Sequence, residues 1–475
     1  MARGEGAGTW ILAAVGVGTF MSALDASIVN VVLPVIRAES GAGVAAVQWV
    51  VTVYLLAVSG TLLGFGRLGD LYGHKRVYLG GFWAFVAGSV LCGIAPTVGL
   101  LAAARGVQGI GAAVLFANSP AIVTTNFPPQ RRGRALGMIA TATYLGLTVG
   151  PPVGGWLADA LTWRAIFFIN VPIGALALTV GWLYVPDDPP APRAEPFDPA
   201  GAALFTGGLV ALLLALNQAH SWGWASAAVL GLLAAAGALL AAFLGWQRRA
   251  AHPMLDLGLF ASRAFSASTG AALLNYVAVY TVVFLMPFYL IQGRGMTASA
   301  AGVLLMVQPA VMAVAAPLAG ALSDRAGCRP LTVAGMSTMT LGLLALGLLP
   351  PGASLAAIAG ALAVIGLGTG AFISPNNSAL MGSAPRGRQG VAAAVLGEAR
   401  NVGMVLGVGF AGAIFTSILP GTPSATDYVR AASAALFAAA GVAAAAALVS
   451  SRLTGESSRC EAGPFTESEV ARDGG

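Results

Sequence analysis

The chain has 475 residues, of which 57% are hydrophobic and only 9% are charged, whereas a soluble globular domain carries about 25% charged residues. A net charge of +6 would suit a nucleic-acid-binding protein, but the basic residues lie in short segments between long uncharged runs, as the positive-inside rule expects of a membrane protein. Composition therefore excludes a soluble domain, disfavours a nucleic-acid partner and predicts that the lipid bilayer is the main solvent.

Long apolar runs follow one another along the chain, and a membrane-spanning helix needs about 20 apolar residues. Dense turn signals such as "APTVG", "FPPQRRGR" and "LLPPGAS" separate the runs. The first run contains Asp25 and continues into further spans, so we expect a retained helix rather than a cleaved signal peptide. The runs predict fourteen membrane-spanning helices, at residues 9–34, 46–66, 77–96, 98–120, 134–158, 165–185, 199–218, 224–246, 265–291, 298–322, 330–350, 354–379, 390–419 and 428–451.

The basic residues outside these spans are divided unevenly between the two sides of the membrane. An even number of spans places both termini on one side, and eighteen Lys and Arg residues fall in the tails and loops of that side, against four on the other. We therefore expect a multi-pass cell-membrane protein with both termini in the cytoplasm.

A polar segment between the second and third predicted spans recurs later in the chain. "GRLGDLYGHKR" at 66–76 aligns with "GALSDRAGCRP" at 320–330, an offset of 254 residues, and "RGR" at 132–134 recurs at 386–388 with the same offset. Two separate matches at one offset indicate an internal duplication, which is typical of secondary transporters. The sequence thus predicts an all-α integral membrane protein with two similar six-helix bundles and two helices inserted between them.

The duplication divides the chain into five segments. We expect the first bundle at 1–185, the inserted helices at 199–246 and the second bundle at 265–452. The segment "QRRAAHPMLDLGLFASRAF" mixes Arg with Leu and Phe, which predicts a helix lying in the cytoplasmic interface, within a linker at 247–264. The acidic, Ser- and Gly-rich segment at 453–475 is typical of a disordered cytoplasmic tail.

The repeated segment predicts a tight turn that could act as a gate. Its glycines allow two helix ends to approach or a positive φ, its aspartate can accept hydrogen bonds at a helix N-terminus, and its basic residues can pair with carboxylates or lipid headgroups. Such contacts could hold the two bundles together at the cytoplasmic side; the alternative is a simple positive-inside anchor. The gating residues are Gly66, Asp70, Gly73, Lys75 and Arg76 in the first copy and Gly320, Asp324, Arg325 and Gly327 in the second.

The segment "GLTVGPPVGG" in the fifth predicted span places small residues on one helix face. Gly146, Gly150 and Gly154 stand at i, i+4 and i+8, which permits close helix packing, and Pro151 can bend the helix. Together with Gly155 they predict a close-packed, bent contact that holds the two halves together during a conformational change. Ordinary packing of small residues is the alternative.

Several segments resemble motifs of the major facilitator superfamily. "GRLGDLYGHKRV" resembles the loop between helices 2 and 3 of that family, although Leu71 and His74 stand where the family usually has basic residues. "LAAARGVQGIGAA" resembles its helix 4 motif with a buried arginine, here Arg105, and "GLTVGPPVGG" resembles its helix 5 antiporter motif. "LDASIVNVVLP" and "WRAIFFINVPIG" resemble segments of the fourteen-helix drug:proton antiporters. The resemblance implies the major facilitator fold, and export by exchange rather than uptake.

Four charged residues lie deep within predicted spans: Asp25, Arg105, Glu398 and Arg400. A charge at the bilayer centre costs about 2.5–3.5 kcal/mol on insertion scales, so such residues usually face a cavity or a partner. Burial favours the protonated form of a carboxyl, so Asp25 and Glu398 could take up a proton outside and release it inside. The resemblance implies that acidic residues of helices 1 and 13 take part in proton coupling and cation recognition. Arg105 could balance a carboxylate or steer protons; purely structural hydrogen bonds are the alternative for Asp25 and Arg105.

Polar and aromatic side chains of several spans could line a substrate cavity, although aromatic residues are often ordinary packing. Asn401 stands three residues after Glu398 and therefore shares its helix face. We expect the substrate-binding residues to be Asn30, Asn275, Tyr276, Tyr280, Gln308 and Asn401.

Motifs of other function classes are missing from the sequence. It contains no phosphate-binding G-x4-G-K-S/T segment and no G-x-S-x-G, and its three histidines show no metal-ligand spacing. We therefore expect no enzyme, no metal and no cofactor, but a monomeric, proton-coupled exporter of amphipathic, cationic or aromatic drugs or antibiotics that works by alternating access. The alternatives are a dedicated exporter of one endogenous natural product or metabolite, a solute uptake symporter and a non-transport membrane protein.

Overall fold

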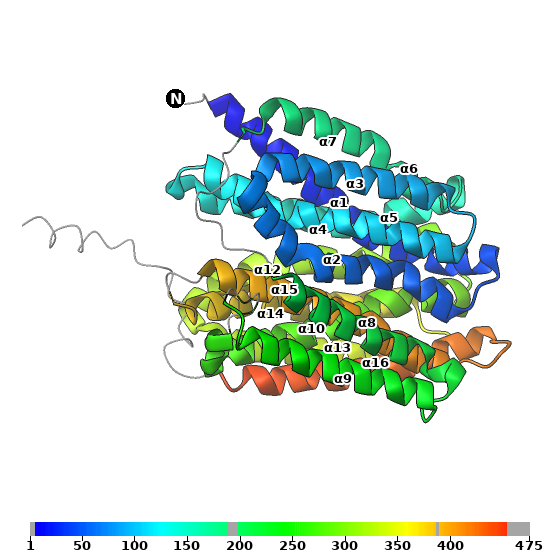
Figure 1. Ribbon diagram of the computed structural model, residues 1–475. Coiled ribbons are helices and arrows are strands. Elements are labelled where there is room, and N and C mark those ends of the chain that lie inside the picture. The colour runs from blue at the N-terminus through cyan, green and yellow to red at the C-terminus, as the bar shows by residue number, and fades with distance from the viewer. Residues whose placement is uncertain are drawn as a thin grey trace, which may run out of the picture.

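The computed structural model describes residues 5–187, 198–251, 253, 255, 257–385 and 389–453. Within these ranges, fourteen helices are long and apolar enough to cross a membrane. This confirms the predicted all-α membrane fold. The structure divides into an upper and a lower helical bundle in the view of Figure 1.

The upper bundle is built from the first part of the chain. Its helices are α1 (Glu5–Ser40), α2 (Val44–Tyr72), α3 (His74–Ile94), α4 (Val98–Asn126), α5 (Pro129–Ala160), α6 (Ala165–Phe168) and α7 (Asn170–Tyr184).

The lower bundle follows two intervening helices, α8 (Pro199–Trp222) and α9 (Ala227–Gln247), and the short 3-10 helix η1 (Leu257–Ala261). Its helices are α10 (Arg263–Pro287), the π-helical segment η2 (Phe288–Gly293), α11 (Ala298–Leu305), α12 (Val307–Ala326), α13 (Cys328–Leu348), α14 (Leu355–Gly382), α15 (Gln389–Ile418) and α16 (Ala425–Ser450).

Two predicted spans are interrupted by short breaks, and a proline follows each break. The sixth span consists of α6 and α7, and the tenth consists of α11 and α12. Pro172 and Pro309 are each the third residue of the new helix. A helix leaves its first amide donors without an intrahelical partner, so a proline at this position forfeits no hydrogen bond of its own helix.

The two bundles repeat the same packing order. In the upper bundle α1 packs on α5, α2 on α4 and α3 on α4; in the lower one α10 packs on α15, α12 on α14 and α13 on α14. The bounds of α3 and α13 differ by 254 residues at both ends, which is the offset of the sequence repeat. The residue-level division into segments stays a prediction, and this repeated packing supports it.

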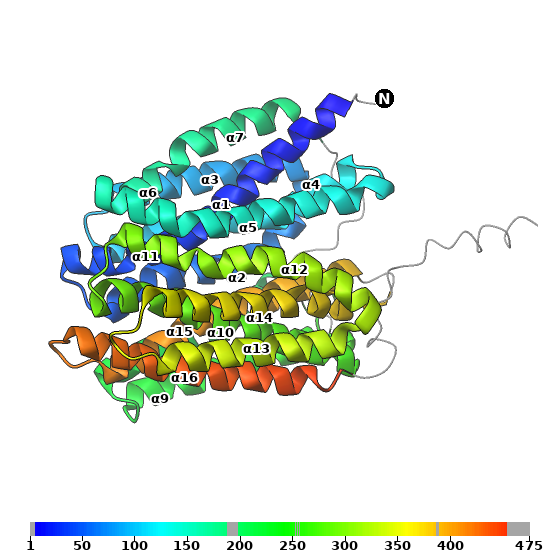
Figure 2. The same cartoon turned by 180° about the vertical axis from the view of Figure 1, so that it is seen from behind.

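Both termini of the helical body lie at one end, here called the terminal end, where α1 begins and α16 ends (Figure 1). The opposite end is called the far end. On the side seen in Figure 2, α11 and α12 of the lower bundle run beside α5 of the upper bundle. On the other side α8 packs against both α2 and α15, so this inserted helix covers the seam between the bundles.

The described part of the predicted interfacial linker contains no long helix, and its place at the membrane interface stays a prediction. Only Leu257–Ala261 forms a short 3-10 helix. Pro253 has no amide donor, and the backbone N–H of Leu255 bonds to the Gln247 side chain instead of continuing a helix. Leu259 is buried against Phe265 and the terminal ends of α14 and α15, and Leu255 and Phe260 are partly buried against the same cluster.

Of the predicted tail, Leu453 is buried against Ala264 and Ala379. The rest of the tail lies outside the described residues.

Candidate functional site

A central cavity of about 420 Å³ lies between the two bundles. Four elements of the upper bundle (α1, α2, α4 and α5) and five of the lower bundle (α10, α11, α12, α14 and α15) line it. This volume is within the usual range for small-molecule sites. The cavity therefore stands where the duplication predicts a substrate site, at the interface between the halves.

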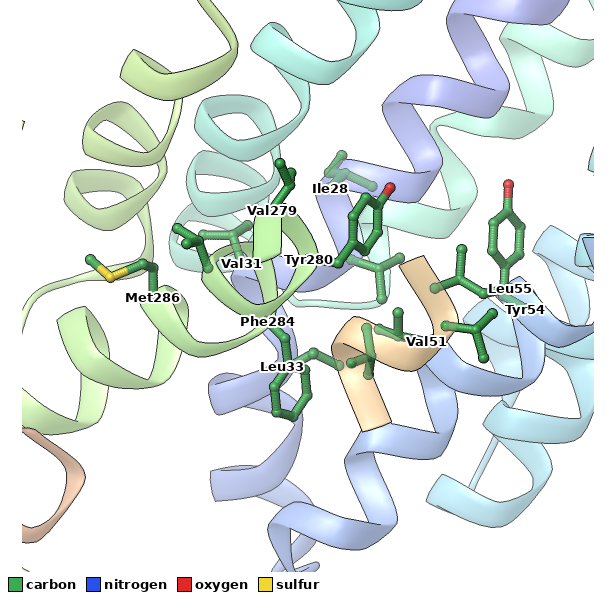
Figure 3. Close-up of a cluster of buried hydrophobic side chains, with 14 of the residues drawn as sticks. Ile28, Val31, Leu33, Val51, Tyr54, Leu55, Val279, Tyr280, Phe284 and Met286 are labelled. Atoms are coloured by element: carbon green, nitrogen blue, oxygen red, sulfur yellow. The ribbon is translucent and has the colours of Figure 1, made fainter. Parts of the chain in front are cut away.

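The far side of the cavity is closed by apolar side chains. Tyr54 of α2 and Tyr280 of α10 line the cavity, and Figure 3 shows both rings with their hydroxyls directed the same way. Leu33, Val51 and Phe284 lie on the opposite side from these hydroxyls and are fully or almost fully buried (Figure 3). They form an apolar layer between the cavity and the far end.

Five of the six predicted substrate-binding residues line the cavity: Asn30, Tyr276, Tyr280, Gln308 and Asn401. The sixth, Asn275, does not, because it precedes Tyr276 by one residue and so points about 100° away from it around α10. Asn275 is fully buried, and its amide atoms have no hydrogen-bond partner among the described residues.

The prediction of the cavity missed most of its lining, including Tyr54, Tyr144 and Arg400. Arg400 stands out in the sequence as a charge inside a span, but its helix face could not be assigned without the partner helices. It is the one charged residue among the described residues that line the cavity.

Asp25 lies inside the upper bundle, at the centre of a buried polar network, and its side chain is fully buried. Arg105 Nη1 is 2.5 Å from Asp25 Oδ2, and the amides of Gln108 and Asn170 donate to Asp25 Oδ1 at 2.8 and 2.9 Å. Both amides also donate to Ser89 Oγ. Helices α1, α3, α4 and α7 thus contribute to one network that compensates a buried carboxylate with a buried guanidinium.

Tyr54 separates this network from the cavity. The Arg105 guanidinium carbon is 4.0 Å from the centre of the Tyr54 ring, while the same tyrosine lines the cavity. Arg105 Nε also donates to the Val50 carbonyl one turn away on α2. A change in the charge of Asp25 can therefore reach the cavity through Arg105 and the α2 segment that carries Tyr54.

Glu398 lies in the lower bundle, on α15. Both of its carboxyl oxygens are buried without a hydrogen-bond partner among the described residues, and it does not line the cavity. Arg400, two residues further on, faces the cavity instead, as expected for positions that do not share a helix face. The proton-coupling role of Glu398 stays a prediction.

Each of the two predicted gating turns contains a glycine with a positive φ. Gly73 and Gly327, which the sequence repeat pairs, have φ values of 92° and 84°, a region that favours glycine. Both turns join helices at the terminal end. Gly66 and Gly320 belong to the last turns of α2 and α12.

The ion pair described for the gating turns lies within one half. Lys75 pairs with Asp187 at 3.4 Å, just after α7 in the same half, and Arg76, Asp324 and Arg325 are exposed. The side chain of Asp70 lies outside what the structure describes. A gating role for this set stays a prediction.

The glycine face of α5 packs within the upper bundle rather than across the halves. A Cβ atom on Gly146, Gly150 or Gly154 would collide with α1. The predicted contact between halves is made instead by the next positions: a Cβ atom on Gly155 would collide with the Ala298 carbonyl of α11, as one on Gly302 would with the Pro151 carbonyl. The row of glycines at 146, 150 and 154, here called the α5 stripe, thus fixes α5 on α1. Gly155, near the far end of α5, touches the other half.

Polar contacts also join the halves at the far end. Arg37 at the end of α1 donates to the Gln292 side chain at 2.9 Å and to the Tyr428 hydroxyl. The Asp159 carboxylate accepts from the Ser299 backbone N–H at 2.8 Å. With the close approach of α5 and α11, these contacts close the far end of the cavity.

Comparison with known proteins shows which proteins this chain resembles. Residues 15–408 match the family model of the Major Facilitator Superfamily. The chain is 35% identical to the riboflavin transporter RibZ of Clostridioides difficile (strain 630), over 86% of this chain and 89% of that protein. It is 35% identical to the multidrug resistance protein Stp of Mycobacterium tuberculosis (strain CDC 1551 / Oshkosh), over 86% of this chain and 76% of that protein. It is 31% identical to the tetracenomycin C resistance and export protein of Streptomyces glaucescens, also over 86% of this chain and 76% of that protein.

A solved structure with the same fold is that of a bacterial homolog of the human lysosomal transporter Spinster. Its TM-score is 0.69 at 17% sequence identity, and the match covers 95% of this chain and 98% of that one. The likeness at this identity shows the fold.

Proposed function

Because the chain belongs to the major facilitator superfamily and is a transporter rather than an enzyme, we propose that it is a proton-coupled antiporter that exports amphipathic aromatic compounds, drugs or antibiotics among them. One observation carries this proposal: a buried carboxylate, Asp25, is linked through Arg105 and Tyr54 to a cavity enclosed between two halves. In an antiporter, proton and substrate act in alternation on one moving structure, so the two sites must be mechanically connected.

The distribution of basic residues supports an orientation with the terminal end in the cytoplasm. The structure, which is closed at the far end, then corresponds to a state that is closed to the outside. Export requires the α5–α11 contact and the Arg37 hydrogen bonds to part, so that the cavity opens outward. One chain supplies both halves of the cavity, which supports a functional monomer.

The names of two relatives support a drug or antibiotic exporter without fixing its breadth. One is named for multidrug resistance and another for tetracenomycin C export, at similar identity to this chain. A dedicated exporter of one natural product is therefore the second candidate. A resistance panel in a pump-deficient host separates the two, because a dedicated exporter protects against one compound class and a broad pump against several.

The coupling is tested by Asp25→Asn in everted membrane vesicles loaded with a pH dye. Each compound of the panel is added to energised vesicles, and proton efflux from the vesicle lumen is recorded. We expect exchange in the wild type and none in the variant, because an amide cannot carry the proton. Immunoblots check that the variant reaches the membrane.

Unchanged exchange in Asp25→Asn would remove Asp25 from the coupling mechanism. Accumulation of compound outside everted vesicles, rather than inside them, would indicate uptake in the cell and contradict export.

A further inference from the structure

The charges that face the cavity are not balanced. Arg105 in the upper bundle is neutralised by Asp25. Arg400 lines the cavity and takes part in no ion pair with any described carboxylate, and no Asp or Glu is among the described lining residues. The cavity therefore presents one positive charge, and in a low-dielectric site such a charge attracts an anion strongly.

Glu398 is the carboxyl group nearest to Arg400 in sequence. It interacts with Arg400 electrostatically, but its oxygens form no hydrogen bond with any described residue and it lies outside the cavity lining. Arg400 instead lies within electrostatic reach of the hydroxyls of Tyr144, Tyr276 and Tyr280, which are neutral. The tyrosines carry no charge and Glu398 forms no described ion pair with Arg400, so no described lining residue supplies a negative partner to the guanidinium.

The cavity also holds unsatisfied amides. Asn401 is 5% exposed and its Nδ2 has no hydrogen-bond partner among the described residues, and Asn30 is 3% exposed with its Oδ1 equally unpartnered. Buried polar atoms without a partner are uncommon in native proteins and call for an explanation such as a missing ligand. One donor and one acceptor on residues that line the cavity thus lack a described partner.

The remaining lining is aromatic and aliphatic. Tyr54, Phe116, Tyr144, Tyr276 and Tyr280 come from both halves, and such rings favour flat aromatic ligands by stacked or edge-on contacts. We infer that the preferred substrates are planar aromatic acids, either phenolates or aryl carboxylates; this inference rests on the function proposed above. Arg400 binds the negative charge of the substrate, and Asn401 and Asn30 bind its other polar groups.

The test compares two dyes that share one skeleton and differ in charge. Fluorescein methyl ester carries a negative charge at mildly alkaline pH, and rhodamine 123 is the methyl ester of the same ring system with a positive charge. Binding to the purified full chain in detergent is measured by fluorescence anisotropy. We expect the wild type to bind the anionic dye at least about tenfold more tightly, the effect of one charged hydrogen bond.

Three variants assign the preference to Arg400. Arg400→Gln should weaken binding of the anionic dye by about 10- to 100-fold without weakening that of rhodamine 123, whereas Arg400→Lys should retain most of the binding. Arg430→Gln removes an exposed arginine at the start of α16 and should leave both affinities unchanged.

Tighter binding of rhodamine 123 by the wild type, binding of neither dye, or equal losses in Arg400→Gln and Arg430→Gln would overturn the inference. The wild-type comparison needs no variant to fold. Binding is measured without a proton gradient, so dye binding in the absence of proton exchange would instead count against the proposed antiport.

Discussion

At the residue scale, the buried ion pair of Asp25 and Arg105 is the interaction whose loss should cost the most free energy. Both side chains are almost fully buried, and removing one partner of such a pair typically costs about 3–5 kcal/mol because the other charge is left uncompensated. Protonation of Asp25 has the same consequence for Arg105. The pair is therefore suited to convert uptake of a proton into a rearrangement of the residues that Arg105 holds.

Tyr54 is the residue through which this rearrangement reaches the cavity, and its ring rather than its hydroxyl should matter. The hydroxyl has no described hydrogen-bond partner, whereas the ring lies over Arg105, a contact that contributes about 2 kcal/mol when desolvated. We expect Tyr54→Phe to retain proton exchange in everted vesicles and Tyr54→Leu to reduce it by about tenfold or more. Equal defects in the two variants would contradict the role of the ring.

The charged residues of this site could be predicted from the sequence, but their contact could not. Asp25 and Arg105 stand out because charges are rare within spans, but their contact joins positions 80 residues apart and could not be read from local spacing. Asn170 and Ser89 carry no signal of their own: ordinary polar residues become functional candidates only when the fold places them beside Asp25.

At the element scale, the α5 stripe shows what a pattern of small residues can predict. Spacing identifies the face of the helix that packs closely, and in the structure a Cβ atom on each of these glycines would lie too close to a neighbouring helix. The identity of the partner helix is a tertiary property. Gly146, Gly150 and Gly154 meet α1, while Gly155, one residue further around the helix, meets α11 of the other half.

The α8–α9 pair is held together at the terminal end by Asp198. This residue caps α8 by accepting the Gly201 N–H at 2.8 Å, and it also accepts from the side chains of Trp246 and Gln247 at the end of α9. Burial alone would raise the pKa of Asp198, but these hydrogen bonds outweigh burial and lower it below its usual range. A lowered pKa means that the ionised carboxylate stabilises the folded state at neutral pH, and that this stabilisation is lost as the pH falls towards the folded-state pKa.

We therefore expect Asp198→Ala to destabilise the protein by about 1–2 kcal/mol at neutral pH, measured as a lower thermal midpoint in detergent, with a smaller deficit in acid. Ser226→Ala is the matched control, because Ser226 caps α9 through a neutral hydroxyl and its deficit should not depend on pH. A deficit of Asp198→Ala that is constant with pH would contradict the assignment.

At the scale of the whole molecule, the duplication was the most informative sequence feature. A single offset predicts the pairing of halves, and it reappears in the bounds of α3 and α13 and in the positive φ of Gly73 and Gly327. The place of α8 and α9 could not be predicted, because they have no counterpart within the repeat. The structure puts α8 on the seam, where Trp49 of α2 donates to Asn217 and a Cβ on Gly409 of α15 would lie 2.9 Å from Leu213.

The membrane potential favours the proposed exchange of an aromatic anion for a proton. Export of an anion and import of a proton each move one positive charge inward, and each charge contributes about 2.3 kcal/mol per 100 mV. The membrane potential would contribute less to the export of a cation, because the outward movement of the cation cancels the charge of the incoming proton. An anion exporter of this design is thus driven strongly even without a pH gradient.

The central claim is that a proton on Asp25 and a substrate in the cavity exclude one another, and linkage makes this measurable in the purified protein. The measurement is the affinity for fluorescein methyl ester across a pH series, in the wild type and in Asp25→Asn. The dye ionises identically in both experiments, so the difference between the two curves reports on the protein. We predict that acid weakens binding to the wild type beyond the change seen with the variant. Parallel curves across the whole series would contradict the account.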